Sequence, residues 1–265
     1  MIFTKRSLIT LTVLVIVGAG LYYLFVERGI TYIWHWEKIP DMLVYHGSKS
    51  ADDSEPRLRM GILMIGFMLT LKISVVSILF AILIGTVVGI ARLSSEPVTR
   101  FISFAYVELI RNTPLLVQLY IIYFFAGSLL RMSAFAAGTS ALSLFAGAYV
   151  AEIVRAGIQS IPKGQMEAAR SLGMNYAKAM RHVILPQAFK QIIPPLAGQF
   201  ISLIKDSSLV SVIALADLTF QAQQAVARTY YAFEIYFTVA FLYLVMTFTL
   251  SMATQYIERR LAISD

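Results

Sequence analysis

Long apolar runs dominate the chain and alternate with short polar segments. Each run is about 20 residues or more, the length at which an α-helix crosses the ~30 Å hydrocarbon core of a bilayer. The third run is the least regular, because Glu108, Arg111 and Pro114 occupy its first half. The pattern predicts an all-α integral membrane protein with six transmembrane helices, near residues 8–26, 61–90, 104–130, 134–154, 191–215 and 233–256.

The composition supports this class. Hydrophobic residues make up 58% of the chain and charged residues 14%, whereas charged residues make up about a quarter of an ordinary soluble protein. The net charge of +7 has a membrane explanation, since basic loops lie beside anionic lipid headgroups, and we do not expect nucleic-acid binding. The absence of cysteine excludes disulfides and thiolate metal sites.

The distribution of Lys and Arg predicts the orientation, because cytoplasmic loops carry an excess of both. Residues 5–6, 92–100, 155–190 and 259–260 are basic, whereas acidic residues outnumber basic ones in 27–60. We therefore expect both termini in the cytoplasm and 27–60 outside. The first apolar run is interpreted as a retained anchor rather than a cleaved signal peptide. The expected organisation is an N-terminal part, 1–60, with its span at 8–26 and its outer segment at 27–60, followed by a transmembrane core at 61–260 with a cytoplasmic loop at 155–190.

The first half of that loop predicts a short exposed helix. Ser160 can cap a helix whose first turn contains Pro162, and residues 163–172 are mostly good helix formers. By helical spacing, Ala168, Ala169 and Leu172 share one face. Spacing alone leaves open whether this helix lies on the lipid surface or docks on another protein.

The second half of the loop predicts a corner and another helix. Gly173 supplies a left-handed stop, and Asn175 can cap a helix over 176–184 that ends before Pro186. The loop is therefore expected to form a helix, a glycine corner and a second helix.

Four motifs carry a family resemblance. Glu167-Ala168-Ala169, then Gly173, then Val183-Ile184-Leu185-Pro186 resembles the EAA loop of ATP-binding-cassette importer permeases, with Val183 in place of isoleucine as the single departure. Residues 108–118, 152–158 and 205–209 resemble the polar amino acid (histidine/glutamine/glutamate type) branch of the same family. The resemblance covers about 61–260.

The resemblance implies a five-helix type I permease core, here preceded by an extra N-terminal helix, in a multi-pass protein of the bacterial inner membrane. It implies a polar amino acid substrate (glutamate, aspartate, glutamine or similar) and alternating access driven by ATP. The implied partners are a dimer of cassette ATPases, which hold the ATP and Mg, a second permease subunit and a periplasmic binding protein. The EAA loop becomes a coupling helix, with expected ATPase-docking residues Gln165, Glu167, Ala168, Ala169, Arg170, Ser171, Gly173 and Pro186.

The chain carries no motif for binding nucleotide or performing catalysis. It lacks the G-x-x-x-x-G-K-[ST] phosphate loop, an H-E-x-x-H pair and a G-x-S-x-G elbow. Its histidines, His35, His46 and His182, are far apart in the sequence. We expect neither enzyme activity nor a bound cofactor or metal ion.

Ionisable residues within apolar runs are costly and normally face a partner or a wet cavity. Lys205 and Asp206 lie in the fifth run beside Ser207 and Ser208, and Lys72 lies deep in the second. We assign these five to the substrate path. A buried ion pair, such as Lys72 with Asp206, is the structural alternative.

Two further pairs have the spacing for contact along a helix face. Glu108 with Arg111 and Glu152 with Arg155 are three residues apart, and we expect a gating or structural role for both.

Two other functions remain open from the residues alone. An ion-coupled secondary transporter would use Lys72, Lys205 and Asp206 as ion sites and would transport without a partner. A membrane scaffold would not depend on Lys205 or Asp206.

Overall fold

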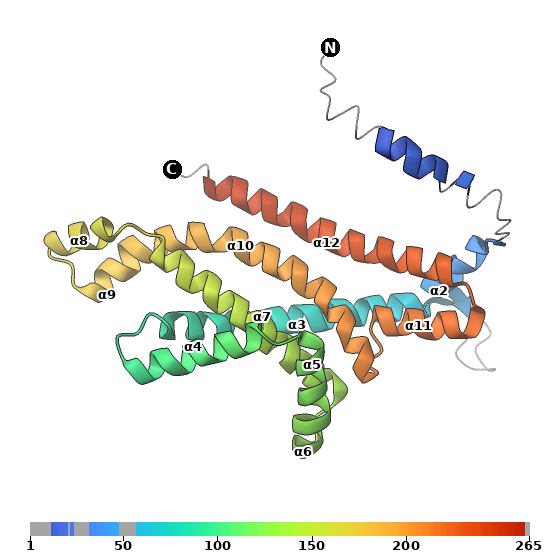
Figure 1. Ribbon diagram of the computed structural model, residues 1–265, viewed down its shortest axis with the longest axis horizontal. Coiled ribbons are helices and arrows are strands. Elements are labelled where there is room, and N and C mark those ends of the chain that lie inside the picture. The colour runs from blue at the N-terminus through green and yellow to red at the C-terminus, as the bar shows by residue number, and fades with distance from the viewer. Residues whose placement is uncertain (1–11, 21, 24–31, 48–56, 263–265) are drawn as a thin grey trace, which may run out of the picture. The chain divides into compact units, whose positions relative to one another are not determined.

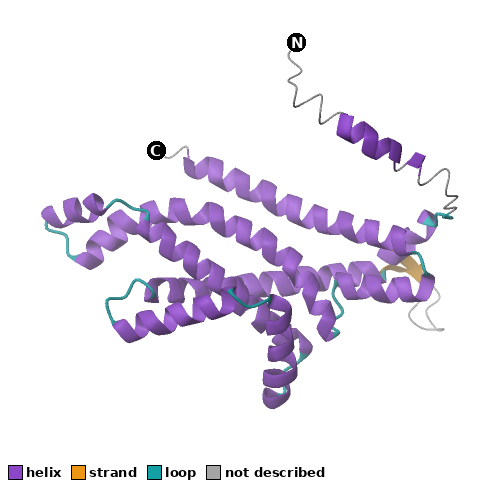
Figure 2. Ribbon diagram, in the orientation of Figure 1, coloured by secondary structure: helices purple, strands orange, loops and turns teal. Residues whose placement is uncertain are grey.

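The computed structural model describes residues 12–20, 22–23, 32–47 and 57–262, and helices make up most of them (Figures 1 and 2). Within the expected first span, residues 12–20 and 22–23 are helical, and the rest of 8–26 lies outside the described residues. The chain separates into two compact units, Met1–Trp36 and Glu37–Asp265. This division comes earlier than the expected boundary at residue 60.

The earlier division has a structural cause in the segment before the first long helix. A 3₁₀ turn, η1 (Trp36–Lys38), leads into α2 (Ile39–Leu43) and the antiparallel strands β1 (Val44–Gly47) and β2 (Arg57–Met60), with Val44 opposite Met60. The α2 helix packs against α3 and α12. This part of the expected outer segment therefore belongs to the larger compact unit.

Four continuous helices in the described residues are long and apolar enough to cross a membrane. They are Ile62–Ala91 (α3), Ala134–Gln159 (α7), Tyr176–Ile213 and Ala232–Tyr256. The last lies within α12 (Ala232–Ala262). These agree with four of the predicted runs, although the helix that includes the fifth run begins fifteen residues before 191.

The third predicted run is a bent pair of helices. α4 (Pro97–Arg111) is followed by α5 (Leu115–Tyr120), a π-helical segment η2 (Ile121–Gly127) and α6 (Ser128–Leu130), with a bend of 106° between the two parts. Pro114 causes the break, because the residue before a proline is forced away from helical geometry. Buried Gln118 closes the bend by donating to the carbonyls of Ile110 (2.8 Å) and Thr113 (3.1 Å). If the bent pair is one span, the described residues hold five candidate spans, so the expected count of six is not reached within them.

Small residues bring α3 and α7 together along much of their length. A Cβ placed on Gly89 would stand 2.7 Å from the carbonyl oxygen of Ala151, so α7 occupies the space that a side chain would need. Helices pack closely in membranes where small residues let their backbones approach. Around this contact lies a core that includes Ile73, Leu119, Leu142, Val150 and Leu203.

Two short segments connect α10 to the helices at the end of the chain. α10 (Leu185–Asp206) continues into a 3₁₀ segment, η4 (Ser207–Ile213), which ends at Ala214 with φ +57°. Asp217 then caps the N-terminus of α11 (Leu218–Thr229), accepting from the backbone N–H of Phe220 at 2.9 Å. α11 packs against α3 and α12.

Candidate functional site

The loop at 155–190 forms the expected pair of short helices, α8 (Lys163–Ser171) and α9 (Tyr176–Ala179), shown in yellow and light orange in Figure 1. The prediction that Ser160 caps the first helix is wrong, because Pro162 occupies the N-cap position. Ser160 instead donates its hydroxyl to the carbonyl of Gly157 at 2.8 Å, since it ends α7 rather than beginning α8. Only residues 160–162 separate the end of α7 from the start of α8.

The glycine corner forms as predicted. Gly173 has φ +82°, a conformation that side chains disfavour. The N–H of Gly173 donates to Arg170 at 3.0 Å, and that of Met174 donates to Ala169 at 3.2 Å, which satisfies carbonyls at the end of α8. Asn175 then accepts from the N–H of Lys178 at 2.9 Å and caps α9. These bonds fix the angle between the two helices.

The prediction that the second helix ends before Pro186 is wrong. A π-helical segment, η3 (Met180–Ile184), joins α9 directly to α10, and Pro186 lies in the first turn of α10. Pro186 follows the π-helical segment, where the regular pattern of backbone hydrogen bonds is already interrupted. The loop is therefore continuous with a transmembrane helix.

One side of α8 is buried and the rest is open. Ala169 is 4% exposed, and α8 packs against η3, with Gln187 donating to Gln165 at 3.3 Å. Of the three residues expected on one face, Ala168 and Leu172 are exposed, whereas Ala169 is buried against the neighbouring segment. The predicted docking residues that are exposed are Gln165, Glu167, Ala168, Arg170, Ser171, Gly173 and Pro186. α8 thus presents small and polar side chains on a firmly held helix.

Lys205, Asp206, Ser207 and Ser208 are consecutive at the junction of α10 and η4, and Lys72 lies on α3. Lys72 and Lys205 are exposed, while Asp206 and Ser208 are partly buried. Neither lysine forms an ion pair within the part of the chain that the structure describes, and the ammonium of Lys72 lies 5.3 Å from the centre of the Phe135 ring.

Ser207 has a structural environment of its own. It is fully buried, accepts from the hydroxyl of Ser74 at 3.3 Å and donates to the carbonyl of Ile204 at 2.7 Å. The hydroxyl of Ser207 therefore ties η4 to α3.

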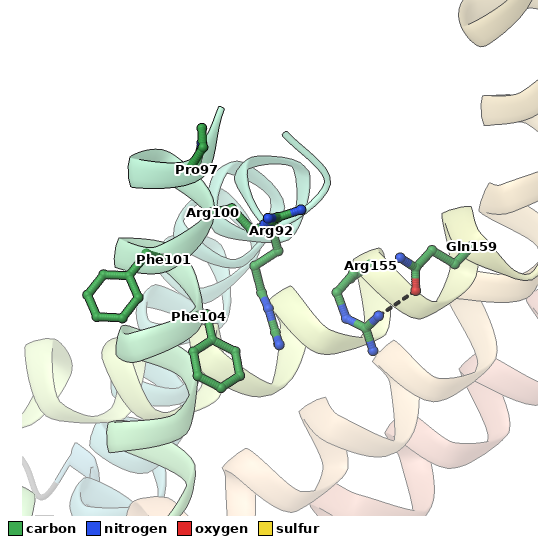
Figure 3. A pocket seen from close by; sticks show the side chains of 7 residues that line it. All are labelled: Arg92, Pro97, Arg100, Phe101, Phe104, Arg155 and Gln159. Carbon is green, nitrogen blue, oxygen red and sulfur yellow. Dashed lines mark hydrogen bonds between the residues drawn. The ribbon is translucent and has the colours of Figure 1, made fainter. Parts of the chain in front are cut away.

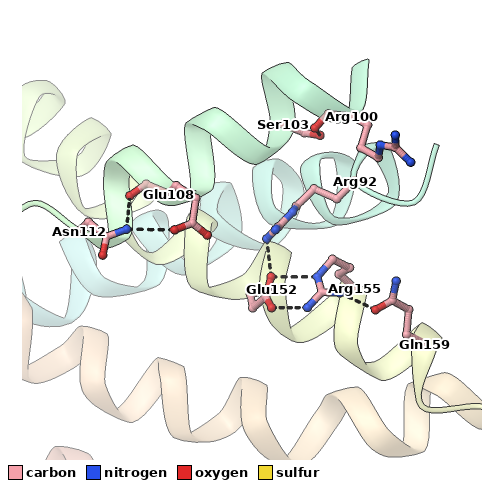
Figure 4. Close-up of polar contacts among 8 residues, drawn as sticks. All are labelled: Arg92, Arg100, Ser103, Glu108, Asn112, Glu152, Arg155 and Gln159. Atoms are coloured by element: carbon pink, nitrogen blue, oxygen red, sulfur yellow. Dashed lines mark hydrogen bonds and ion pairs between the residues drawn. The ribbon is translucent and has the colours of Figure 1, made fainter. Parts of the chain in front are cut away.

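The Glu152–Arg155 pair is present and belongs to a larger network. Arg155 binds Glu152 through both Nε (3.0 Å) and Nη2, and it also donates to Gln159 on the same helix (Figure 4). Arg92, at the end of α3, donates to Oε2 of Glu152, the oxygen that also accepts from Nε of Arg155, and it lies 5.5 Å from the centre of the Phe104 ring (Figure 4). One carboxylate therefore holds guanidinium groups from two helices, which fixes the end of α3 against α7.

The second predicted pair takes a different form. Glu108 accepts from the amide of Asn112 at 3.1 Å, while the Arg111 guanidinium lies 5.1 Å from the centre of the Tyr149 ring. No Glu108–Arg111 ion pair occurs among the described residues. The reason is that α4 ends at Arg111, so Asn112 reaches back to Glu108 and Arg111 turns toward α7.

Two functional groups were missed by the sequence reasoning. Arg92 was counted only as a loop charge, and nothing in the sequence links it to Glu152, sixty residues away. Asp217 was not singled out, although an Asp before an amphipathic segment is a cap signal. Asp217 is fully buried, and this burial raises the pKa of its carboxyl to about 6 despite the N–H bonds that it accepts. Among the described residues, no group of three or more His, Asp or Glu side chains is placed to hold a metal ion.

Known proteins are similar over most of the chain. A probable glutamine ABC transporter permease protein of Bacillus subtilis (strain 168) is 45% identical over 197 residues, which cover 74% of this chain and 91% of that protein. An L-cystine transport system permease protein of the same organism is 44% identical over 74% of this chain and 85% of its own length. The crystal structure of an amino acid ABC transporter with histidines superposes with a TM-score of 0.71 at 46% identity, covering 75% of this chain and 94% of that one.

These relatives are transport subunits rather than enzymes, and ATP hydrolysis belongs to a separate partner in systems of this kind. The family implies ATPase and binding-protein partners, a second permease and a place in the bacterial inner membrane. The matching family model, which describes the binding-protein-dependent transport system inner membrane component, covers residues 77–263. The chain therefore belongs to the family of inner-membrane permeases of binding-protein-dependent ABC importers.

Proposed function

We propose that this chain is the permease subunit of an ABC importer for a polar amino acid of the glutamine type. The observation that carries the proposal is the 45% identity with a permease named for glutamine. A permease named for L-cystine is almost as similar, so the substrate has to be identified by transport measurements.

In this proposal the protein has six transmembrane helices, with both termini in the cytoplasm. The bent pair α4–α6 counts as one span, and the run at 8–26 is an additional N-terminal span before the five-helix core. The segment 27–60 lies in the periplasm. The excess of Lys and Arg at the ends of α3 and α7 and in the 155–190 loop supports this orientation.

We infer that α8 docks on a cassette ATPase and transmits its movement. Its exposed small and polar side chains suit a close fit into a groove, and Glu167 and Arg170 offer charges for directed contacts. The short connection at 160–162 leads to α7, and the Glu152 network ties α7 to α3. ATP-driven approach of two ATPases would thus move the ends of several spans together and switch the side to which the cavity opens.

The substrate path is proposed to pass Lys72, Lys205, Asp206 and Ser208. An amino acid carries both a carboxylate and an ammonium, so a path bearing both signs of charge matches its ends. Lys72 and Lys205 are exposed in the single chain, where a second permease subunit could enclose them. Ser207 contributes by holding η4 in place rather than by meeting substrate.

The test is uptake by the purified complex. The tagged chain, co-purified with its ATPase and supplied with its binding protein, is reconstituted in liposomes, and ATP-dependent uptake of labelled glutamine is measured with unlabelled arginine and cystine as competitors. We expect glutamine uptake that requires ATP. Glu167→Lys should prevent the ATPase from co-purifying, whereas Asp41→Lys, a matched charge reversal at an exposed residue of α2, should not.

Two results would contradict the proposal. Uptake by the chain alone, driven by an ion gradient, would identify a secondary transporter. Uptake of cystine or arginine that glutamine does not inhibit would keep the importer assignment and overturn the substrate class.

A further inference from the structure

A pocket of about 520 Å³ opens where the end of α3, the first half of α4 and the end of α7 meet (Figure 3). Its wall contains Arg92, Arg100 and Arg155 together with Phe101 and Phe104. We propose that this pocket binds an anionic phospholipid of the cytoplasmic leaflet, with the phosphate on the arginines and an acyl chain against the phenylalanines.

The charge of the pocket calls for an anion. Glu152 already accepts hydrogen bonds from Arg92 and Arg155, and Arg100 adds a third guanidinium group to the wall, so one carboxylate offsets three positive charges. The side chain of Arg100 makes no hydrogen bond or ion pair within the part of the chain that the structure describes. Guanidinium groups match phosphate oxygens in geometry as well as charge. The pocket therefore has a net positive charge and an arginine free to bind.

The apolar part of the wall favours a lipid over a small soluble anion. Phe101 is 69% exposed and Phe104 is 47% exposed, and at a spacing of three residues they lie on neighbouring positions of one α4 face. Exposed Val98 and Ile102 extend the apolar surface of α4 beyond the pocket. A free phosphate or carboxylate would leave these rings uncovered, whereas an acyl chain would cover them.

The position of the pocket agrees with this ligand. Arg92 directly follows α3, and Gln159 is the last residue of α7, so the pocket lies at one end of two spans. By the excess of basic residues this end is cytoplasmic, and basic pockets between transmembrane helices on that side bind acidic headgroups. A lipid here would bridge α4 and α7 beside the Glu152 network.

The test counts bound lipids on the full chain with its co-purifying subunits. The complex is extracted in mild detergent, supplied with phosphatidylglycerol or phosphatidylcholine, and analysed by native mass spectrometry. We expect phosphatidylglycerol to be retained preferentially. Arg100→Gln should lower its retention about fivefold, the effect of one basic residue near an anionic lipid, while Arg100→Lys should keep most of it. Arg181→Gln, the same charge change at an exposed residue of η3, is the matched control and should leave retention unchanged.

Two further arms separate the possible sources of the anion. Phe101→Ser keeps every charge and should weaken phosphatidylglycerol retention, and millimolar glycerol 3-phosphate, the headgroup without chains, should not displace the lipid. Equal retention by Arg100→Gln and wild type would overturn the site. Displacement by glycerol 3-phosphate, or unchanged retention by Phe101→Ser, would overturn the lipid in favour of a soluble anion. Folding of each variant is checked by gel filtration. Among the described residues, the side chain of Arg100 makes no hydrogen bond or ion pair, so its replacement removes none.

Discussion

Gly85 on α3 lies so close to Val150 on α7 that a Cβ at residue 85 would stand 2.4 Å from the Cβ of Val150. The carbonyl oxygen of Gly147 would be 2.8 Å away. Neither atom can move without moving α7 itself, so this contact sets the distance between the two helices on which the Glu152 network depends.

Gly85→Ala should therefore destabilise the protein. Overpacking of a tight contact costs about 1–3 kcal/mol, and we expect a lower melting temperature in detergent and a lower yield of monodisperse protein. Gly198→Ala is the matched control, because a Cβ there meets nothing within 4 Å and alanine favours the helix by up to about 1 kcal/mol. Equal losses from both substitutions would contradict the close approach of α3 and α7.

The corner after α8 gives a prediction about ATPase binding. Gly173→Val places a β-branched residue at φ +82°, where side chains cost about 1–2 kcal/mol, and it should reorient α8 and reduce the amount of co-purifying ATPase. Gly173→Asn should keep most of the ATPase, since asparagine tolerates the left-handed region. Membrane insertion of both variants, checked by extraction and gel filtration, should match wild type. Retention of ATPase by Gly173→Val would show that the corner does not orient the docking surface.

Asp217 gives a prediction about pH. Its pKa is raised from an ordinary value of 3.8 to about 6, so the folded state prefers the protonated form, and stability is lost as pH rises from about 4 to about 6. The shift lowers the free energy of unfolding at neutral pH by about 3 kcal/mol relative to its value below pH 4. Asp217→Asn keeps an acceptor for the α11 cap and removes the charge. It should raise the melting temperature at pH 7.5.

The same variant carries its own control. As pH falls from 6 to 4, wild-type Asp217 becomes protonated and the difference in melting temperature should close. If Asp217→Asn lowers the melting temperature at pH 7.5 and the difference does not change with pH, the carboxylate is charged and favourably placed in the folded protein.

The Glu152 network predicts a coupled loss. Glu152→Gln removes the charge shared by Arg92 and Arg155, and hydrogen bonds to charged groups contribute about 1.5–3 kcal/mol. We expect a marked fall in melting temperature and in transport. Glu108→Gln should have a smaller effect, because the Glu108 carboxylate accepts only from exposed Asn112 among the described residues. In a double-mutant cycle, Arg92→Gln should cost less in the Glu152→Gln background than in wild type. If the losses of stability from the two substitutions were strictly additive, Arg92 and Glu152 would not be coupled, and the proposed link between α3 and α7 would be contradicted.

Local patterns in the sequence predicted local structure well. The apolar runs placed α3, α7 and α12, and Gly173 and Asn175 marked the corner and the cap. Each of these features depends on residues within a few positions of one another, so spacing and backbone preference are sufficient.

Contacts between distant segments could not be predicted in this way. The hydrogen bond from Ser74 to Ser207 joins residues 133 apart in the sequence, and Arg92 meets Glu152 across 60. Ser160 does not cap α8, because its hydroxyl donates to the carbonyl of Gly157 at the end of α7. Arg111 does not pair with Glu108, because its guanidinium group lies over the aromatic ring of Tyr149 on another helix. These outcomes depend on tertiary packing, which spacing along one segment does not contain.

The continuity of α9, η3, α10 and η4 has a mechanical consequence. The 38 residues from Tyr176 to Ile213 span about 57 Å at helical rise, nearly twice the bilayer core. Such an element acts as a lever, and a tilt of 10° about its middle would displace each end by about 5 Å. Pro194 and Pro195 interrupt its hydrogen bonds near the middle and supply a natural pivot. A push received at the Gly173 corner would therefore arrive at the opposite end of the membrane beside Asp217 as a swing of η4.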